Sequence, residues 1–325
     1  MVTDKYTNWL LSLIFAFIYI YIIPWIELYG GDFVDINSYI TRIIYLHDGR
    51  PEAEYFGLKW LISEPVWKAM LIGFGNLFTD YRAVLYGISF VSVFIYVSFL
   101  IKRVEFYIAM IFLLNPMMVD LFIAQLRSVF AFSIVLLAYG LYENNKDAKI
   151  LPIILLILAT LIHMSMPIFY GVYYLMYRLN DKVEDYKYYF FAIITGLFIA
   201  LFMKYGSNLI LTMIGDRHAG YDEYIASASI AYSIAWFIIT LILATFGDFS
   251  DREKRVGVAY AITFMAFFFF ASVLNIFAAR YVAIIMPFII LAISYLPKHI
   301  KQGTYLFLVV YNIYSFKYWL SLVII

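Results

Sequence analysis

Two arginines and a histidine stand out because each lies in or beside an apolar segment. Arg127, in "AQLRSVF" at 124–130, separates two runs that are each long enough to cross much of a bilayer. Arg280 precedes "YVAIIMPFII", and His163 interrupts an otherwise apolar run. An arginine inside a membrane costs at least about 2.5–3.5 kcal/mol, so it normally faces a partner or a polar cavity. We expect Arg127 and Arg280 to line such a cavity, with snorkelling to the headgroups as the alternative.

Arginines of this kind suit the binding of phosphate. The planar guanidinium matches phosphate oxygens bidentately and keeps its charge when buried. Arg127 and Arg280, with Arg217 as a weaker third contact, would bind the diphosphate of a lipid whose tail stays in the bilayer. The nearest acidic residue to Arg127 along the sequence is Asp120. If the diphosphate is a leaving group, the arginines would stabilise its developing charge.

A transfer reaction onto a hydroxyl also needs a base. The candidates are His163, Asp32, Asp35 and Glu64. An unperturbed imidazole has a pKa of about 6.5, which suits proton acceptance near neutral pH. His163 could instead be a hydrogen-bonded break between helices, and each carboxylate could simply be solvated in a loop. Asp32 is the runner-up, because it lies closest to the end of the first expected helix.

The composition predicts the scaffold that must position these groups. Of 325 residues, 65% are apolar and 14% are charged, and apolar runs recur along the whole chain. We therefore expect an all-α fold, a polytopic helical membrane protein with residues 1–325 as a single transmembrane domain. There is no cysteine to form disulfides or bind metal, and a net charge of +1 indicates no nucleic-acid partner. No nucleotide-binding or metalloprotease motif is present, so we expect no cofactor and no metal.

About eleven membrane segments follow from the apolar pattern. The segment 66–79 is too short to span the membrane, and we expect it to form an interfacial or re-entrant helix. Residues 150–177 read as two short helices bent back at the polar "HMSMP" (163–167). The expected spanning helices lie near 9–29, 83–101, 105–122, 128–142, 188–205, 230–246, 256–275, 281–297 and 304–323.

The lysines and arginines then predict the orientation. With the N-terminus in the cytoplasm, every short basic loop falls on the inner side. The outer side receives loops near 30–65 and 206–229, together with Arg127, His163 and Arg280. The candidate site residues therefore gather at the outer face of the membrane.

Several segments resemble one family in the same order along nearly the whole chain. "AQLRSVFAFSIVLLAYGLY" resembles the arginine-led helix of the EpsG/Wzy-type polysaccharide polymerases, although Ser128 replaces the usual glutamine after the arginine. "GGDFVDINSYI", "ISEPVWKAML", "ILATLIHMSMPIFYGVYYL" and "RHAGYDEY" resemble the family's Gly–x–Asp, Glu–Pro, histidine and later arginine motifs.

This resemblance implies an O-antigen or capsular polysaccharide polymerase with a GT-C-like helical fold. Such an enzyme is an inverting, metal-independent glycosyltransferase of the bacterial inner (cytoplasmic) membrane, with its active site facing the periplasm. It moves a glycan from undecaprenyl diphosphate onto a lipid-linked repeat unit. The implied partners are the undecaprenyl-diphosphate-linked oligosaccharide, membrane lipids and a chain-length co-polymerase.

Three other functions remain open from the sequence. A flippase for the lipid-linked oligosaccharide, or an ion-coupled transporter, would also carry charges within the membrane, but no inverted repeat with paired broken helices is visible. An O-antigen ligase would use the same donor chemistry on a different acceptor. A membrane acyltransferase would need a histidine beside an acyl-donor tunnel, for which His163 alone is the support.

Overall fold

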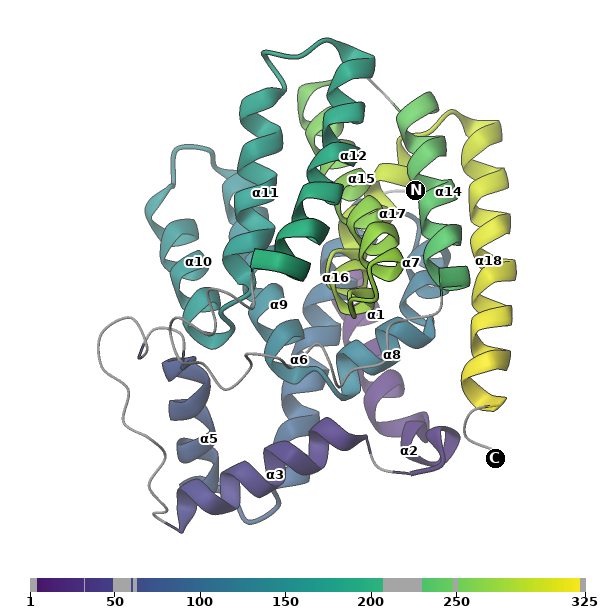
Figure 1. Cartoon of the computed structure of the whole chain (residues 1–325). Coiled ribbons are helices and arrows are strands. Elements are labelled where there is room, and N and C mark those ends of the chain that lie inside the picture. The colour runs from purple at the N-terminus through teal and green to yellow at the C-terminus, as the bar shows by residue number, and fades with distance from the viewer. Residues whose placement is uncertain are drawn as a thin grey trace. The chain divides into compact units, whose positions relative to one another are not determined.

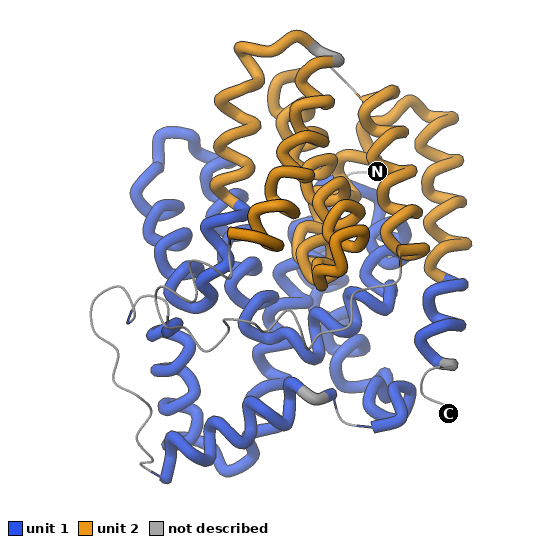
Figure 2. The backbone as a smooth tube through the Cα atoms, in the orientation of Figure 1, with its two compact units in different colours: residues 1–169, 313–325 blue, residues 170–312 orange. Residues whose placement is uncertain are grey.

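The computed structural model describes residues 5–31, 33–48, 60, 63–206, 230–247 and 251–321. All regular secondary structure within those ranges is helical, and none of it is strand. The predicted all-α class is therefore confirmed. The helices form two compact units, residues 1–169 with 313–325 and residues 170–312, drawn in blue and orange in Figure 2.

Unit 1 holds most of the predicted site residues. Its helices are labelled in Figure 1. It contains α1 (Lys5–Phe17), the π-helix η1 (Ile18–Ile22), α2 (Trp25–Tyr29), α3 (Val34–His47), α5 (Pro65–Leu77), α6 (Tyr81–Ile101), α7 (Phe106–Leu113), α8 (Pro116–Ile123), α9 (Leu126–Asn144) and α10 (Ile150–Ile162). The helix α11 (Met166–Leu179) begins in unit 1 and continues into unit 2.

Unit 2 contains the remaining helices. They are α12 (Asp185–Leu201), the π-helix η2 (Phe202–Gly206), α14 (Ile230–Phe246), α15 (Arg252–Val273), α16 (Ala279–Ile284), α17 (Met286–Ser294) and most of α18 (Lys298–Ser321). The centre of this unit is α15, whose residues are mostly buried against α12, α14 and α17.

Four described helices are long and apolar enough to cross a membrane. They are Tyr81–Ile101, Leu126–Asn144, Lys187–Gly206 and Arg252–Val273, and a fifth span results if α7 and α8 are counted as one bent span. Their length and composition are consistent with the predicted helical membrane protein. The predicted short helix at 66–79 is confirmed as α5, which is not among the four.

Prolines break three segments that the sequence predicted as continuous spans. The predicted helix 9–29 ends at Ile22, and α2 starts after Pro24. The predicted helix 105–122 is instead α7 and α8, which meet at an angle of 76°. The break falls at Pro116, which has no N–H to donate, and the side chain of Asn115 caps the new helix by accepting from Met117 N at 2.8 Å. The predicted helix 281–297 likewise divides at Ile285, two residues before Pro287, into α16 and α17.

The break that was predicted at "HMSMP" is confirmed. Helix α10 ends at Ile162, His163 is extended at its C-cap, and α11 starts at Met166. Part of the segment that was predicted as an outer loop, 30–65, forms the helix α3. The other predicted outer loop, 206–229, lies outside the described residues apart from its first residue.

Close packing within unit 1 positions the helix ends that carry the site residues. Helix α9 packs between α6 and α10, and α5 packs against both α3 and α10. The helices α3 and α5 approach closely at Gly75, where a Cβ atom would lie 3.3 Å from Cγ2 of Ile43. Since α5 and α10 are in contact, the residue before α5 and the residue after α10 can meet near the start of α9.

Candidate active site

Glu64 lies at the centre of a cluster that joins three of the predicted site residues. Its Oε2 atom forms an ion pair with Nη1 of Arg127. Its Oε1 atom lies 2.5 Å from Nδ1 of His163 and accepts a longer hydrogen bond of 3.4 Å from the backbone N–H of Met164. One carboxylate therefore contacts both the arginine and the histidine that the sequence selected.

The three residues come from three helix ends. Glu64 immediately precedes α5, Arg127 is the second residue of α9, and His163 is the C-cap of α10. Side chains at helix ends can leave the apolar helix face and meet one another. The side chains are 10% exposed for Glu64, 14% for His163 and 26% for Arg127, so the cluster is shielded yet reachable.

The backbone of Glu64 is strained. Its φ of 57° and ψ of 60° lie in the left-handed region, which residues with a side chain rarely adopt. Pro65 follows, and a proline normally pushes the preceding residue towards extended conformations. Strain of this kind costs on the order of 1–3 kcal/mol and persists where surrounding contacts enforce it, often at functional sites.

The charges of the cluster keep Glu64 ionised. Burial by itself opposes ionisation, but the hydrogen bond with His163 and the positive charge of Arg127 outweigh it and lower the pKa of Glu64 to about 2 from the usual 4.5. The acidic partner of Arg127 is distant in sequence, because Glu64 lies 63 positions before it. Asp120, which is nearest in sequence, instead accepts a hydrogen bond of 2.5 Å from Nε2 of Gln125.

Two aromatic residues of the site were missed by the sequence interpretation. The hydroxyl of Tyr39, on α3, is hydrogen-bonded to Arg127. Trp67, on α5, is fully buried and packs edge-on against Tyr39 with 5.5 Å between ring centroids. The available signal was "INSYI", where the tyrosine lies in the segment that matched the family's Gly–x–Asp motif.

Two buried donors at this site have no hydrogen-bond partner among the described residues. They are Nε of Arg127 and the indole Nε1 of Trp67. A buried donor without a partner costs about 1–3 kcal/mol, so such groups commonly mark a place where a ligand or water binds. Arg127 therefore keeps hydrogen-bonding capacity beyond its contacts with Glu64 and Tyr39.

Of the other predicted site residues, Asp35 acts through its negative charge on the Tyr39 hydroxyl of the cluster. Asp35 is exposed in the first turn of α3. Arg280 is partly exposed in unit 2, near the rings of Phe277 and Tyr281 at 5.9 and 5.8 Å. Its helix α16 has only six residues, in place of the continuous helix 281–297 that the sequence predicted. Asp32 and Arg217 lie outside the described residues.

The arrangement of Glu64 and His163 can support proton transfer. An ionised carboxylate on Nδ1 fixes that nitrogen as the one that carries the proton, which leaves Nε2 as the basic nitrogen. The same carboxylate stabilises the imidazolium that forms when Nε2 accepts a proton. Glu64 itself is a weak base because its pKa is low. Within the described ranges, no group of three or more His, Asp or Glu side chains could hold a metal ion.

A comparison with known protein families supports the resemblance that the sequence motifs indicated. The sequence pattern of the EpsG family matches residues 9–324. The chain belongs to the EpsG family. EpsG is the family of Wzy-type polysaccharide polymerases, so the resemblance read from the motifs is confirmed. No curated protein and no solved structure matches the chain.

Proposed function

We propose that this EpsG-family protein is an O-antigen or capsular polysaccharide polymerase, a glycosyltransferase that uses a lipid diphosphate as the leaving group. The observation that carries the proposal is the meeting of Glu64, Arg127 and His163 at three helix ends. This cluster combines the two groups that the reaction needs, a cation for a diphosphate and a base for an acceptor hydroxyl.

The proposed reaction is a single displacement. The acceptor hydroxyl oxygen of a lipid-linked repeat unit attacks the anomeric carbon of the donor glycan. The bond between that carbon and the diphosphate oxygen breaks, and undecaprenyl diphosphate leaves with the bonding electrons. The hydroxyl proton passes to Nε2 of His163 and later to water. A single displacement inverts the anomeric centre, and the proposal requires no metal.

Each residue of the cluster has a separate role in this proposal. His163 is the general base, and Glu64 is a positioning residue that orients the imidazole and offsets its positive charge. Glu64 also lies between His163 and Arg127, so it reduces the repulsion that a protonated histidine would meet from the arginine. Arg127 would bind the diphosphate through donors that Glu64 does not occupy, such as Nε. Arg280 and Arg217 are proposed as further diphosphate contacts.

The remaining expectations belong to the same proposal. We place the protein in the bacterial inner membrane with about eleven membrane segments in a GT-C-like arrangement, and with the cluster on the periplasmic side. The support for this orientation is the distribution of lysine and arginine among the short loops. A separate co-polymerase would set the length of the product.

A gel of the surface polysaccharide tests the reaction. Deletion of the gene should abolish the ladder of polymer lengths while a single capped repeat unit remains, and the wild-type gene should restore the ladder. Arg127→Lys keeps the charge but loses the planar fork, so it should restore little polymer at a normal protein level. Loss of every repeat unit on deletion would instead indicate a flippase or a ligase and contradict the proposal.

A further inference from the structure

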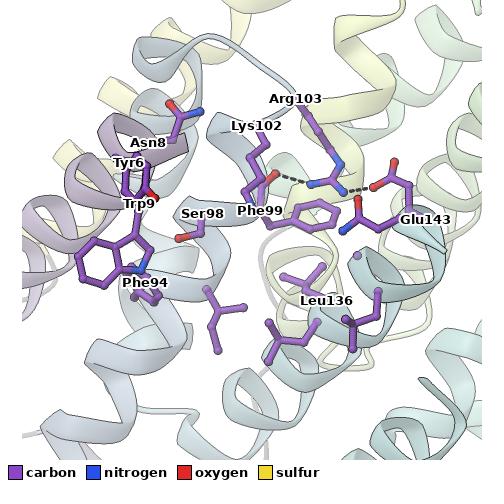
Figure 3. Close-up of a pocket in the computed structure, with 15 residues that line it drawn as sticks. Tyr6, Asn8, Trp9, Phe94, Ser98, Phe99, Lys102, Arg103, Leu136 and Glu143 are labelled. Carbon is purple, nitrogen blue, oxygen red and sulfur yellow. Dashed lines mark hydrogen bonds and ion pairs between the residues drawn. The ribbon is translucent and has the colours of Figure 1, made fainter. Parts of the chain in front are cut away.

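A cavity lies at the other end of α9 from the catalytic cluster. It has a volume of about 840 Å³ and is formed by residues of α1, α6 and α9 and of the turn after α6 (Figure 3). This volume falls within the range of about 300–1,000 Å³ that is typical of small-ligand sites. Glu143, which lines the cavity, follows Arg127 by 16 residues, which corresponds to about 24 Å along a helix. The cavity is therefore distinct from the Glu64–Arg127–His163 site.

The cavity has a polar end and an apolar end. Figure 3 shows Lys102, Arg103 and Asn8 at one end and Leu136 towards the other. Leu137 and Leu141 also line the cavity. The aromatic rings of Trp9, Phe94 and Phe99 line the walls between them. Such a gradient from charge to hydrocarbon matches a lipid that lies with its headgroup at the membrane surface and a chain in the bilayer.

The polar end carries one net positive charge. Arg103 is held by an ion pair with Glu143, by a hydrogen bond of 2.7 Å to the backbone oxygen of Phe99, and by the ring of Phe99 at 3.9 Å. Arg103 and Glu143 offset each other, so the charge that remains among the lining residues is that of Lys102. One positive charge complements the single negative charge of a phosphodiester better than the larger charge of a lipid diphosphate.

A second observation also points to a ligand. The hydroxyl oxygen of Ser98 is buried and has no hydrogen-bond partner among the described residues. Several other helix serines in this unit, such as Ser92 and Ser133, donate to the backbone oxygen four residues earlier. In the view of Figure 3, Ser98 lies between the rings of Trp9 and Phe99. Its hydroxyl is thus placed to contact an ester or phosphate oxygen in the cavity.

We propose that this cavity is a binding site for one anionic glycerophospholipid, with its phosphodiester at Lys102 and an acyl chain along the aromatic and leucine walls. Basic pockets between membrane helices on the cytoplasmic side bind anionic headgroups in this way. The orientation expected from the basic loops places Lys102 on that side. The site goes beyond the proposed polymerase reaction and does not depend on it.

Gly140 allows the cavity to be filled without disturbing the fold. It lines the cavity, and a Cβ atom added there would meet no other atom within 4 Å. The substitution Gly140→Leu should therefore place its side chain in the space for the acyl chain. A Cβ atom added at Gly87, on α6, would also meet no other atom within 4 Å, but Gly87 does not line the cavity. Gly87→Leu is therefore a matched control. Lys149, which is exposed and does not line the cavity, provides the matched control for the charge.

Native mass spectrometry of the full-length protein tests the site. The protein is taken from nanodiscs that contain equal amounts of phosphatidylglycerol and phosphatidylcholine with the same acyl chains. The wild type should retain one phosphatidylglycerol in preference to phosphatidylcholine. Lys102→Gln should reduce this preference about five-fold, as expected for one lysine at an anionic surface, whereas Lys149→Gln should not. Gly140→Leu should lose the retained lipid, and Gly87→Leu should keep it.

Other results would overturn the proposal. The first is equal retention of the two phospholipids by the wild type. The second is unchanged retention of phosphatidylglycerol in both Lys102→Gln and Gly140→Leu. The third is displacement of phosphatidylglycerol by an equimolar amount of undecaprenyl diphosphate. Because Lys102 is an exposed surface residue, its variant remains informative even if Gly140→Leu fails to fold.

Discussion

At the scale of single residues, Glu64 serves two neighbours with one carboxylate. Its Oε1 atom contacts His163 and its Oε2 atom contacts Arg127. Removing either partner would leave a buried charge with less compensation, which typically costs several kcal/mol. Glu64, which the sequence presented as one of several candidate carboxylates, therefore determines how Arg127 and His163 are held.

Kinetics can separate the proposed role of His163 as the base from the proposed positioning role of Glu64. His163→Ala should lower kcat by roughly 10²–10⁴-fold with little effect on donor binding, because it removes the proton acceptor. Glu64→Gln keeps the size of the side chain but loses the charge that stabilises the imidazolium. Its kcat should fall by less, and the acid limb of the pH–rate profile should move to lower pH. An unmoved profile in Glu64→Gln would limit Glu64 to a structural role.

The low pKa of Glu64 also predicts how stability depends on pH. Because the folded-state pKa of about 2 lies below the usual 4.5, ionised Glu64 stabilises the fold above about pH 4.5. This contribution, on the order of 3 kcal/mol, should be lost as the pH falls from about 4.5 towards about 2. The difference in unfolding free energy between the wild type and Glu64→Gln should therefore be larger at pH 6 than at pH 3. A difference that does not change over this interval would contradict the assignment.

At the scale of helices, close packing in unit 2 depends on one small residue. A Cβ atom at Gly196 of α12 would lie 2.5 Å from the backbone oxygen of Thr263 and 2.7 Å from the backbone nitrogen of Phe267, both on α15. Glycine allows the backbones of membrane helices to approach in this way. Any side chain at this position must push the two helices apart.

Substitution of this glycine should destabilise unit 2. Gly196→Ala should cost about 1–3 kcal/mol, as overpacking usually does, and lower the melting temperature in detergent micelles. Gly257→Ala is the control, because a Cβ atom there meets nothing within 4 Å and alanine favours helix by up to about 1 kcal/mol over glycine. Equal melting temperatures for the two variants would show that α12 and α15 can separate without cost.

The sequence predicted helices better than it predicted their interruptions. Apolar length located α6, α9, α14 and α15, and the polar residues after Ile162 located the break at His163. The breaks at Pro24, at Pro116 and before Pro287 were missed because the apolar pattern continues through all three. Pairing of Glu64 with Arg127 and His163 joins residues 63 and 99 positions apart. Such a contact depends on how α5, α9 and α10 pack together, and a local sequence pattern does not predict that packing.

At the scale of the whole molecule, the lack of cysteine makes the orientation directly measurable. Asp48, at the end of α3, and Asp147, between α9 and α10, are both exposed and lie on opposite sides of the membrane in the proposed topology. In intact cells, an impermeant maleimide should label Asp48→Cys but not Asp147→Cys. Both should react after lysis, and the wild type should never react. If only Asp147→Cys is labelled in intact cells, the topology is the opposite of the proposed one and the cluster lies on the cytoplasmic side.

The separation of 63 positions between Glu64 and Arg127 also determines the order in which the ribosome synthesises the two partners. At about 5–20 residues per second, Glu64 is synthesised some 3–13 seconds before Arg127. The nascent chain therefore already holds the counter-charge of Arg127 when Arg127 enters the bilayer. His163 is the last of the three to be translated, so the proposed proton acceptor is added to a chain that already contains both charged partners.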